Sequence, residues 1–136
     1  MANVLAIDVG DRKIGLAIGD QASGFAFVRP ALLVSDWAEA WPLLVQLIAQ
    51  EAVSAVVVGI PLNTDASAGP QAGRVREFIR ELGSRVPVPI LERNEHSTSQ
   101  AVQREQQTHD RALKRGEEDS LAAQLLLESY FQETRS

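Results

Sequence analysis

The chain has 136 residues, of which 45% are hydrophobic and 23% charged, and its formal net charge is −5. These values are ordinary for a soluble globular protein, and the length suits a single domain over residues 1–136. The absence of cysteine excludes disulfides, thiolate catalysis and cysteine-ligated zinc, and the presence of only two histidines, His96 and His109, argues against a histidine-rich zinc site. We therefore expect any bound metal to be a hard cation held by carboxylates.

The sequence contains no apolar run of membrane-spanning length and no signal-peptide pattern. We therefore expect a cytoplasmic protein that does not enter a membrane. The negative net charge argues mildly against strong non-specific binding of nucleic acid, because such binding is driven by neutralising phosphates. Two groups of basic residues form either local basic patches or ordinary solvated surface: Arg74, Arg76, Arg80 and Arg85, and then Arg111, Lys114 and Arg115.

Three short apolar runs, at residues 4–9, 14–18 and 25–28, predict strands. The links between them are short, which predicts an antiparallel meander. Asp36 is placed to cap a helix over about residues 37–50, in which a proline is tolerated only near the first turn.

The second half of the chain alternates strands and helices. The valine-rich run 55–58 predicts a strand covered on both faces, and a loop rich in Gly, Pro, Asn, Asp and Ser separates it from a helix over about residues 71–82. A fifth strand is predicted over 86–91, where Pro87 and Pro89 favour an edge position.

Two further helices are predicted near the C-terminal end. The first is capped by Ser97 or Thr98 and runs to about residue 107, and after a charged loop the last helix begins at Asp119 and Ser120. The resulting order is three strands, a helix, a strand, a helix, a strand and two helices. This order predicts an α/β fold in which a mixed sheet is flanked by helices.

Asp8 is the one charged residue in the first apolar run. A buried carboxylate costs several kcal/mol unless it is paired or coordinates a metal. Gly10, two residues later, allows backbone or a ligand to approach closely. The pattern predicts a metal or phosphate site on a sheet, the alternative being that Asp8 only begins the turn.

Several other acids accompany Asp8. Glu92 and Glu95 follow the fifth predicted strand, and Asp119 stands at the start of the last helix, where an acid is also an ordinary cap. Phosphodiester hydrolysis by two metal ions about 4 Å apart needs several carboxylates that converge on one point. The acids of this chain offer such a set.

Three motifs carry a resemblance to a known family. They are LAIDVG at 5–10 followed by IGLA at 14–17, VVGIPLN at 57–63, and DSLAA through ESYF at 119–131. In this order and spacing they resemble the YqgF/RuvX family of ribonuclease H-like proteins. The resemblance implies a ribonuclease H-like α/β fold with a five-stranded mixed sheet, three antiparallel strands being followed by parallel strands.

The resemblance also implies a function. It implies a nuclease that processes the 5′ end of pre-16S rRNA in ribosome biogenesis, with Mg²⁺ or Mn²⁺ as cofactor and nucleic acid as partner, RNA being favoured and DNA possible. Resolution of Holliday junctions, or another DNA cleavage, is the alternative implied by the likeness of the family to RuvC. A catalytically weak RNA-binding assembly factor is the second alternative. The chain is expected to act as a monomer or a homodimer.

The resemblance assigns the catalytic and metal-binding acids. Asp8 matches the first-strand acid of the family and Asp119 the last-helix acid. For the middle acid, an alignment without gaps places the family's glutamate on Asn94, a shift of one residue places it on Glu95, and an insertion of two residues places it on Glu92. We prefer Glu95, which keeps an acid just beyond the strand.

Five other residues are candidates for substrate contact or proton transfer. Arg12 and Lys13 are placed to contact phosphate, or equally to form a solvated hairpin tip. Asn63 and Thr98 are further substrate-binding candidates, although Asn63 is equally suited to shaping its turn. His96, beside the acids, is a candidate general base.

Overall fold

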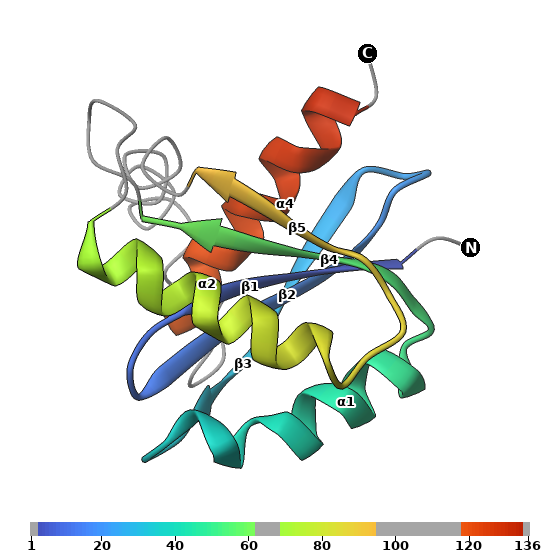
Figure 1. Ribbon diagram of the computed structural model, residues 1–136. Coiled ribbons are helices and arrows are strands. Elements are labelled where there is room, and N and C mark those ends of the chain that lie inside the picture. The colour runs from blue at the N-terminus through green and yellow to red at the C-terminus, as the bar shows by residue number, and fades with distance from the viewer. Residues whose placement is uncertain (1–2, 62–68, 95–117, 135–136) are drawn as a thin grey trace.

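A five-stranded sheet forms the centre of the computed structural model, which describes residues 3–61, 69–94 and 118–134 (Figure 1). The strand order is β3-β2-β1-β4-β5. The antiparallel part consists of β1 (Asn3–Val9), β2 (Lys13–Asp20) and β3 (Phe25–Leu33). The parallel part adds β4 (Val53–Ile60) beside β1 and β5 (Ile90–Asn94) beside β4. This arrangement confirms the predicted fold class.

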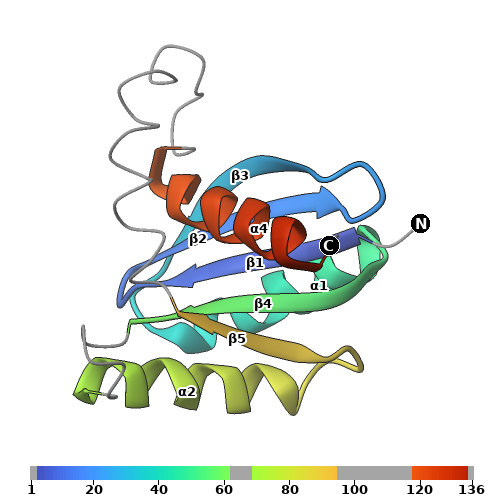
Figure 2. The same ribbon diagram turned by 90° about the horizontal axis from the view of Figure 1, so that it is seen from above.

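Helices cover both faces of the sheet (Figure 2). On one face lie α1 (Trp41–Gln50) and α2 (Pro70–Gly83), and on the other lies α4 (Leu121–Thr134). Alternate residues of a strand point to opposite faces. In β1, Leu5 and Ile7 accordingly enter the core under α1 and α2, whereas Val4 and Ala6 enter the core under α4.

The helices on the first face begin as the sequence predicts. The Asp36 carboxylate accepts the Ala38 N–H at 2.8 Å and caps a short 3₁₀ helix, η1 (Trp37–Glu39). α1 follows with its proline in the first turn, and α2 lies within a residue of the predicted bounds. Trp37 and Trp41 both pack on Phe78 of α2, with ring centroids 5.3 and 4.9 Å away, which joins the two helices.

The two edge strands differ from their predicted bounds. β3 continues to Leu33 through Pro30, which an edge strand tolerates because one side of its backbone needs no partner. β5 begins at Ile90, after both prolines, and ends at Asn94, so the predicted range 86–91 was wrong although the edge position is confirmed. The helix predicted to end near residue 107 lies outside the described residues.

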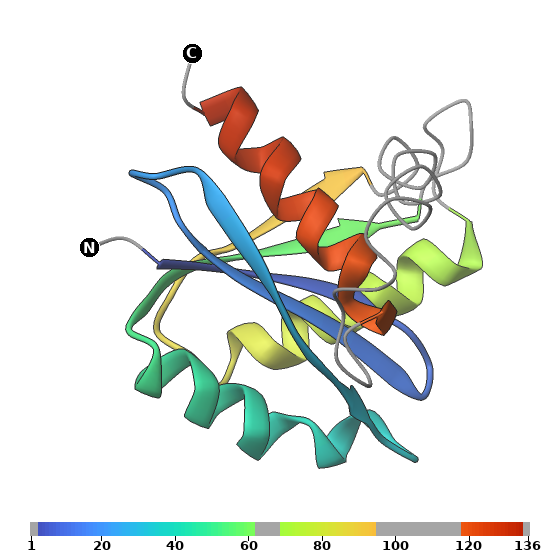
Figure 3. The ribbon, with the colours of Figure 1, turned by 180° about the vertical axis from the view of Figure 1, so that it is seen from behind.

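The last helix crosses the face of the sheet opposite α1 and α2 (Figure 3). It is preceded by a 3₁₀ turn, η3 (Glu118–Ser120). This N-terminal end of α4 lies at the end of the sheet where β1 and β4 finish (Figure 2). Within the described ranges, no helix is both long and apolar enough to span a membrane.

Candidate active site

Asp8 and Asp119 lie on the same face of the sheet and at the same end. Asp8 follows Val4 and Ala6 in the alternation of β1, so its side chain belongs to the face covered by α4. Its cross-strand partner is Gly15 of β2. A Cβ atom added to Gly15 would lie only 2.6 Å from the backbone oxygen of Asp119. The missing side chain of Gly15 therefore makes the space that Asp119 uses to approach the strand position opposite Asp8.

Basic residues adjoin these acids. The Lys13 Nζ lies 3.5 Å from Asp119 Oδ1, and both side chains are partly exposed. Such an exposed pair stabilises the fold by no more than about 1 kcal/mol, so it leaves Asp119 free to exchange one cation for another. Arg12, exposed on the hairpin between β1 and β2, borders a polar cavity of about 420 Å³ that Trp37 and Arg74 also line.

The described candidates for the middle acid lie on the other face. Glu92 is paired in the sheet with Val58 of the core under α1 and α2, and its Oε1 lies 3.3 Å from Nε of Arg76 on α2. Asn94 is paired with Ile60, which belongs to the same core. By the alternation of β5, both positions face away from Asp8. Glu95, the preferred candidate, lies outside the described residues, as do Asn63, His96 and Thr98.

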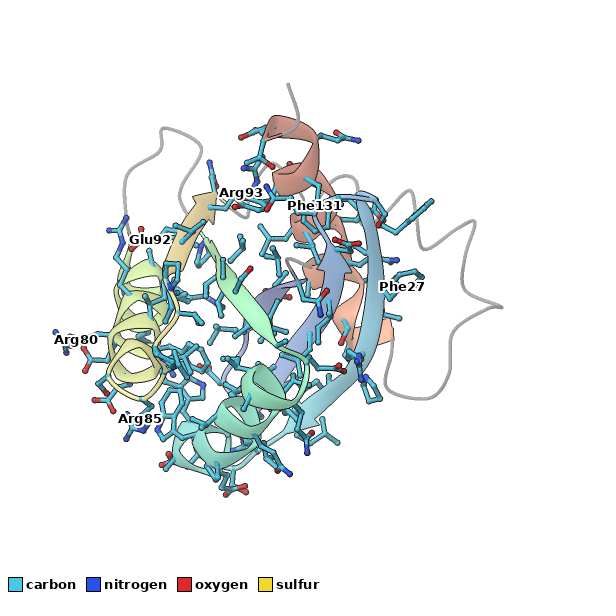
Figure 4. All side chains as sticks on the ribbon, turned by 90° about the vertical axis from the view of Figure 1, so that its right-hand side faces the viewer. Phe27, Arg80, Arg85, Glu92, Arg93 and Phe131 are labelled. Carbon is cyan, nitrogen blue, oxygen red and sulfur yellow. The ribbon has the colours of Figure 1, made fainter. Side chains whose placement is uncertain are left out.

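Arg93, between these two positions, points to α4 (Figure 4). Its guanidinium donates to Ser129 Oγ at 2.7 Å and to Glu133 Oε2 at 2.8 Å. The hydrogen bond from Arg93, and then its charge, lower the pKa of the Glu133 carboxyl. The buried Nε of Arg93 has no hydrogen-bond partner among the described residues. Arg93 therefore joins the edge strand β5 to α4, the helix that follows Asp119.

The arginines of α2, together with Arg85 just after it, form no free basic patch. Each is engaged by an acid, and the pairs are Arg74 with Asp11, Arg76 with Glu92, Arg80 with Glu77, and Arg85 with Glu81. Arg74 and Arg85 also lie over the rings of Trp37 and Trp41. These pairs favour the ordinary solvated-surface interpretation for this group, while the group at residues 111–115 lies outside the described ranges.

The site residues present suit a hard divalent cation. Carboxylate oxygens are the donors that Mg²⁺ and Mn²⁺ prefer, and Asp8 and Asp119 offer them from one face. The described part of the chain holds no group of three or more Asp, Glu, His or Cys side chains arranged for a metal ion. A third carboxylate would have to come from residues outside that part.

Sequence reasoning predicted the two acids but not the residues that hold Asp119 against the sheet. Gly15 and Ser120 both lie within the family motifs. A motif does not show that Gly15 contacts the Asp119 backbone, or that Ser120 binds the Leu16 N–H, 104 residues away in the sequence. The sequence indicated the role of Arg93 less clearly, because Arg93 is a single basic residue within a charged segment. Its side-chain contacts depend on a helix that follows about 30 residues later.

The fold defines the structural class to which the chain belongs. The structure of Thermus thermophilus RuvC in complex with a Holliday junction superposes with a TM-score of 0.65, at 12% identity, covering 100% of this chain and 98% of that one. The fowlpox virus resolvase with its junction DNA gives a TM-score of 0.60 at 16% identity, covering 98% and 99% of the two chains. At these identities the likeness shows the fold alone, which is that of the RuvC-like members of the ribonuclease H-like proteins.

The sequence comparisons identify the family. The family model described as "RuvX: Holliday junction resolvase" matches residues 2–133. A relative from Salmonella arizonae is 33% identical over 132 residues, which is 96% of either chain, and one from Mesorhizobium japonicum is 31% identical over 96% of this chain and 80% of its own. Both are named "Putative pre-16S rRNA nuclease". The chain therefore belongs to the RuvX family, and the prediction that it is a nuclease is confirmed at the level of the family.

Proposed function

We propose that this protein is a metal-dependent nuclease that hydrolyses phosphodiester bonds in structured RNA and processes the 5′ end of pre-16S rRNA in the cytoplasm. Its catalytic carboxylates are Asp8, Glu95 and Asp119, held in one nuclease domain. The observation that carries the proposal is the approach of Asp119 to Gly15, the sheet partner of Asp8. The names of the relatives support the choice of RNA.

Asp8 and Asp119 would hold Mg²⁺ or Mn²⁺ from the face of the sheet covered by α4. The support for Glu95 as third ligand is by elimination, since Glu92 and Asn94 face α2. A divalent ion bound there supplies an activated water and a counter-charge for the phosphate oxygens. The carboxylates are held on two different elements, which orients them before substrate arrives and lowers the entropic cost of the reaction.

Lys13 and Arg12 have separate roles in this proposal. Lys13 neutralises Asp119 at 3.5 Å when no other cation is bound, and turns toward the substrate phosphate when one is. Arg12 is exposed at the hairpin beside the site. It contacts the phosphate backbone of the nucleic acid farther from the cleaved bond. Asn63 and Thr98 complete the proposed substrate contacts.

A second candidate function is the resolution of Holliday junctions. It is favoured by the description of the family model and by the junction complexes among the structural neighbours. The same carboxylates would serve either substrate, so the chemistry of the site does not separate them. Resolution would additionally require a symmetric dimer that sets two sites at a fixed separation.

Cleavage by the purified protein should separate these functions. Labelled oligomers with the 5′ flank of 16S rRNA, the same sequence in DNA, and a four-way DNA junction are incubated with Mg²⁺, Mn²⁺, Zn²⁺ or excess chelator. We expect cleavage of the RNA with Mg²⁺ or Mn²⁺ and none with Zn²⁺ or chelator, because the chain has no cysteine and only two histidines. Asp119→Asn serves as the inactive control. Undiminished cleavage in chelator would rule out metal-assisted hydrolysis at this site, and no cleavage of any substrate would leave the RNA-binding assembly factor as the better proposal.

A further inference from the structure

Ser120 is a fully buried polar residue at the N-terminal end of α4. Its Oγ accepts the Leu16 N–H at 2.9 Å and donates to the Arg29 carbonyl at 2.6 Å. Leu16 and Arg29 are partners across β2 and β3, at the point where the register of that ladder shifts. The hydroxyl thus bridges two backbone groups of the sheet that would otherwise need other partners.

This bridge fixes the position of Asp119. Asp119 precedes Ser120 directly, and its carbonyl lies against the bare Cα of Gly15. The side chain of Asp119 contacts Lys13 Nζ at 3.5 Å in a partly exposed ion pair, and such a pair is weak in water. The two short hydrogen bonds of Ser120 are therefore the rigid part of the link between Asp119 and the strand that faces Asp8.

We propose that Ser120 is a positioning residue for metal binding, which sets Asp119 at a fixed place relative to Asp8. The inference rests on the proposed function, because it assigns a purpose to holding Asp119. Residues that orient a ligand without touching the metal typically change metal affinity 10- to 100-fold when replaced. A displaced Asp119 keeps its charge, so the affinity of the site for the metal ion falls without disappearing.

The test measures metal binding without substrate. Mn²⁺ binding is followed by the electron paramagnetic resonance of the free ion for the full chain and for Ser120→Ala. We expect Ser120→Ala to bind Mn²⁺ about 10- to 100-fold more weakly. Cleavage by this variant should recover as Mg²⁺ is raised, because the ligand is misplaced and not removed. Ser120→Cys is slightly larger but keeps a weak donor and a weak acceptor. Its Mn²⁺ affinity should fall between those of the natural chain and Ser120→Ala, and it replaces Ser120→Ala if that variant does not fold.

Gln124→Ala is the matched control. Gln124 lies one turn farther along α4, and its Nε2 donates to the Ala26 carbonyl of the same strand, β3, at 3.0 Å. Its loss also weakens the attachment of α4 to the sheet, but at a distance from Asp119. We expect an unchanged Mn²⁺ affinity even where the melting temperature falls as far as in Ser120→Ala.

The outcomes separate the inference from the function on which it rests. If Asp119→Asn loses Mn²⁺ binding while Ser120→Ala and Ser120→Cys bind as the natural chain does, the positioning role is overturned and the metal site stands. If Ser120→Ala and Gln124→Ala weaken binding equally, the effect is one of general stability and the positioning role is again overturned. If Asp119→Asn binds Mn²⁺ as well as the natural chain, the metal site itself is wrong, and the inference falls with it.

Discussion

Gly15→Ala is the smallest change that should disturb the two acids together. The added Cβ would lie 2.6 Å from the Asp119 oxygen and 3.2 Å from the Ser120 Cα, and both atoms belong to the backbone. Ordinary van der Waals contacts of a Cβ atom begin at 3.4 Å. To lengthen the contact from 2.6 Å to 3.4 Å, the Asp119 carbonyl must move by about 0.8 Å. A misplacement of about 1 Å at a catalytic group can reduce the rate about 100-fold.

We therefore expect kcat/KM for cleavage to fall about 100-fold in Gly15→Ala, together with a loss of about 1–3 kcal/mol in the free energy of unfolding from overpacking. The assay is steady-state cleavage of the RNA oligomer at saturating Mg²⁺, with urea unfolding measured in parallel. Gly73→Ala is the control, because a Cβ at that helical position meets nothing within 4 Å. It should leave cleavage unchanged and stabilise the protein by about 0.5–1 kcal/mol.

Natural activity in Gly15→Ala would refute this reasoning. A variant that loses stability yet cleaves at the natural rate would show that the contact serves folding and that the placement of Asp119 tolerates the shift. Equal losses of activity in both glycine variants would also count against it. The Gly73 position lies in α2, on the face of the sheet opposite the two acids.

Three further predictions concern single carboxylates. Asp8→Asn should lower activity by orders of magnitude while the melting temperature without metal holds or rises, because an uncompensated charge contributes little stability; full activity would exclude Asp8 from catalysis. Glu95→Gln should reduce cleavage more than Glu92→Gln, since Glu92 is engaged by Arg76 on the other face; abolition by Glu92→Gln alone would reverse the assignment. Glu133 has a lowered pKa, so its stabilising contribution is present above its unfolded pKa of about 4.3 and is lost as the pH falls through its folded pKa. Urea unfolding of Glu133→Gln should differ from the natural chain near neutral pH and converge with it in acid, and a difference independent of pH would contradict this.

The central strands and the helices of the first face could be predicted because hydrophobic burial determines their patterns. β1 and β4 lie inside the sheet and read as continuous apolar runs, and α2 shows one apolar side. The first and last residues of the edge strands could not be predicted in this way. The charged segment of β5 is satisfied by side chains from both layers, Arg76 on one side and Glu133 on the other. A pattern based on hydrophobicity does not register such pairing.

The acids of the candidate site were predicted because a carboxylate in an apolar strand is conspicuous. The choice among middle acids could not be made from sequence, because it depends on which face each strand position occupies. A shift of one residue in a strand moves a side chain to the opposite face. The side chains of Glu92 and Arg93 show this directly, since they approach α2 and α4 respectively (Figure 4).

Helix α4 connects the parts of the proposed site. At its N-terminal end Ser120 binds the β2–β3 ladder beside Asp119, and near its C-terminal end Ser129 and Glu133 bind Arg93 of β5. Arg93 lies two positions before Glu95, so the helix that fixes Asp119 also holds the strand that leads toward the proposed middle acid. Functional side chains must be held within about 0.5 Å of their productive geometry, and helices and strands achieve this more precisely than loops. The hydrogen bonds at both ends of α4 give this chain such an element, through the buried Ser120 at the start of the helix and through the half-buried Ser129 and exposed Glu133 near its end.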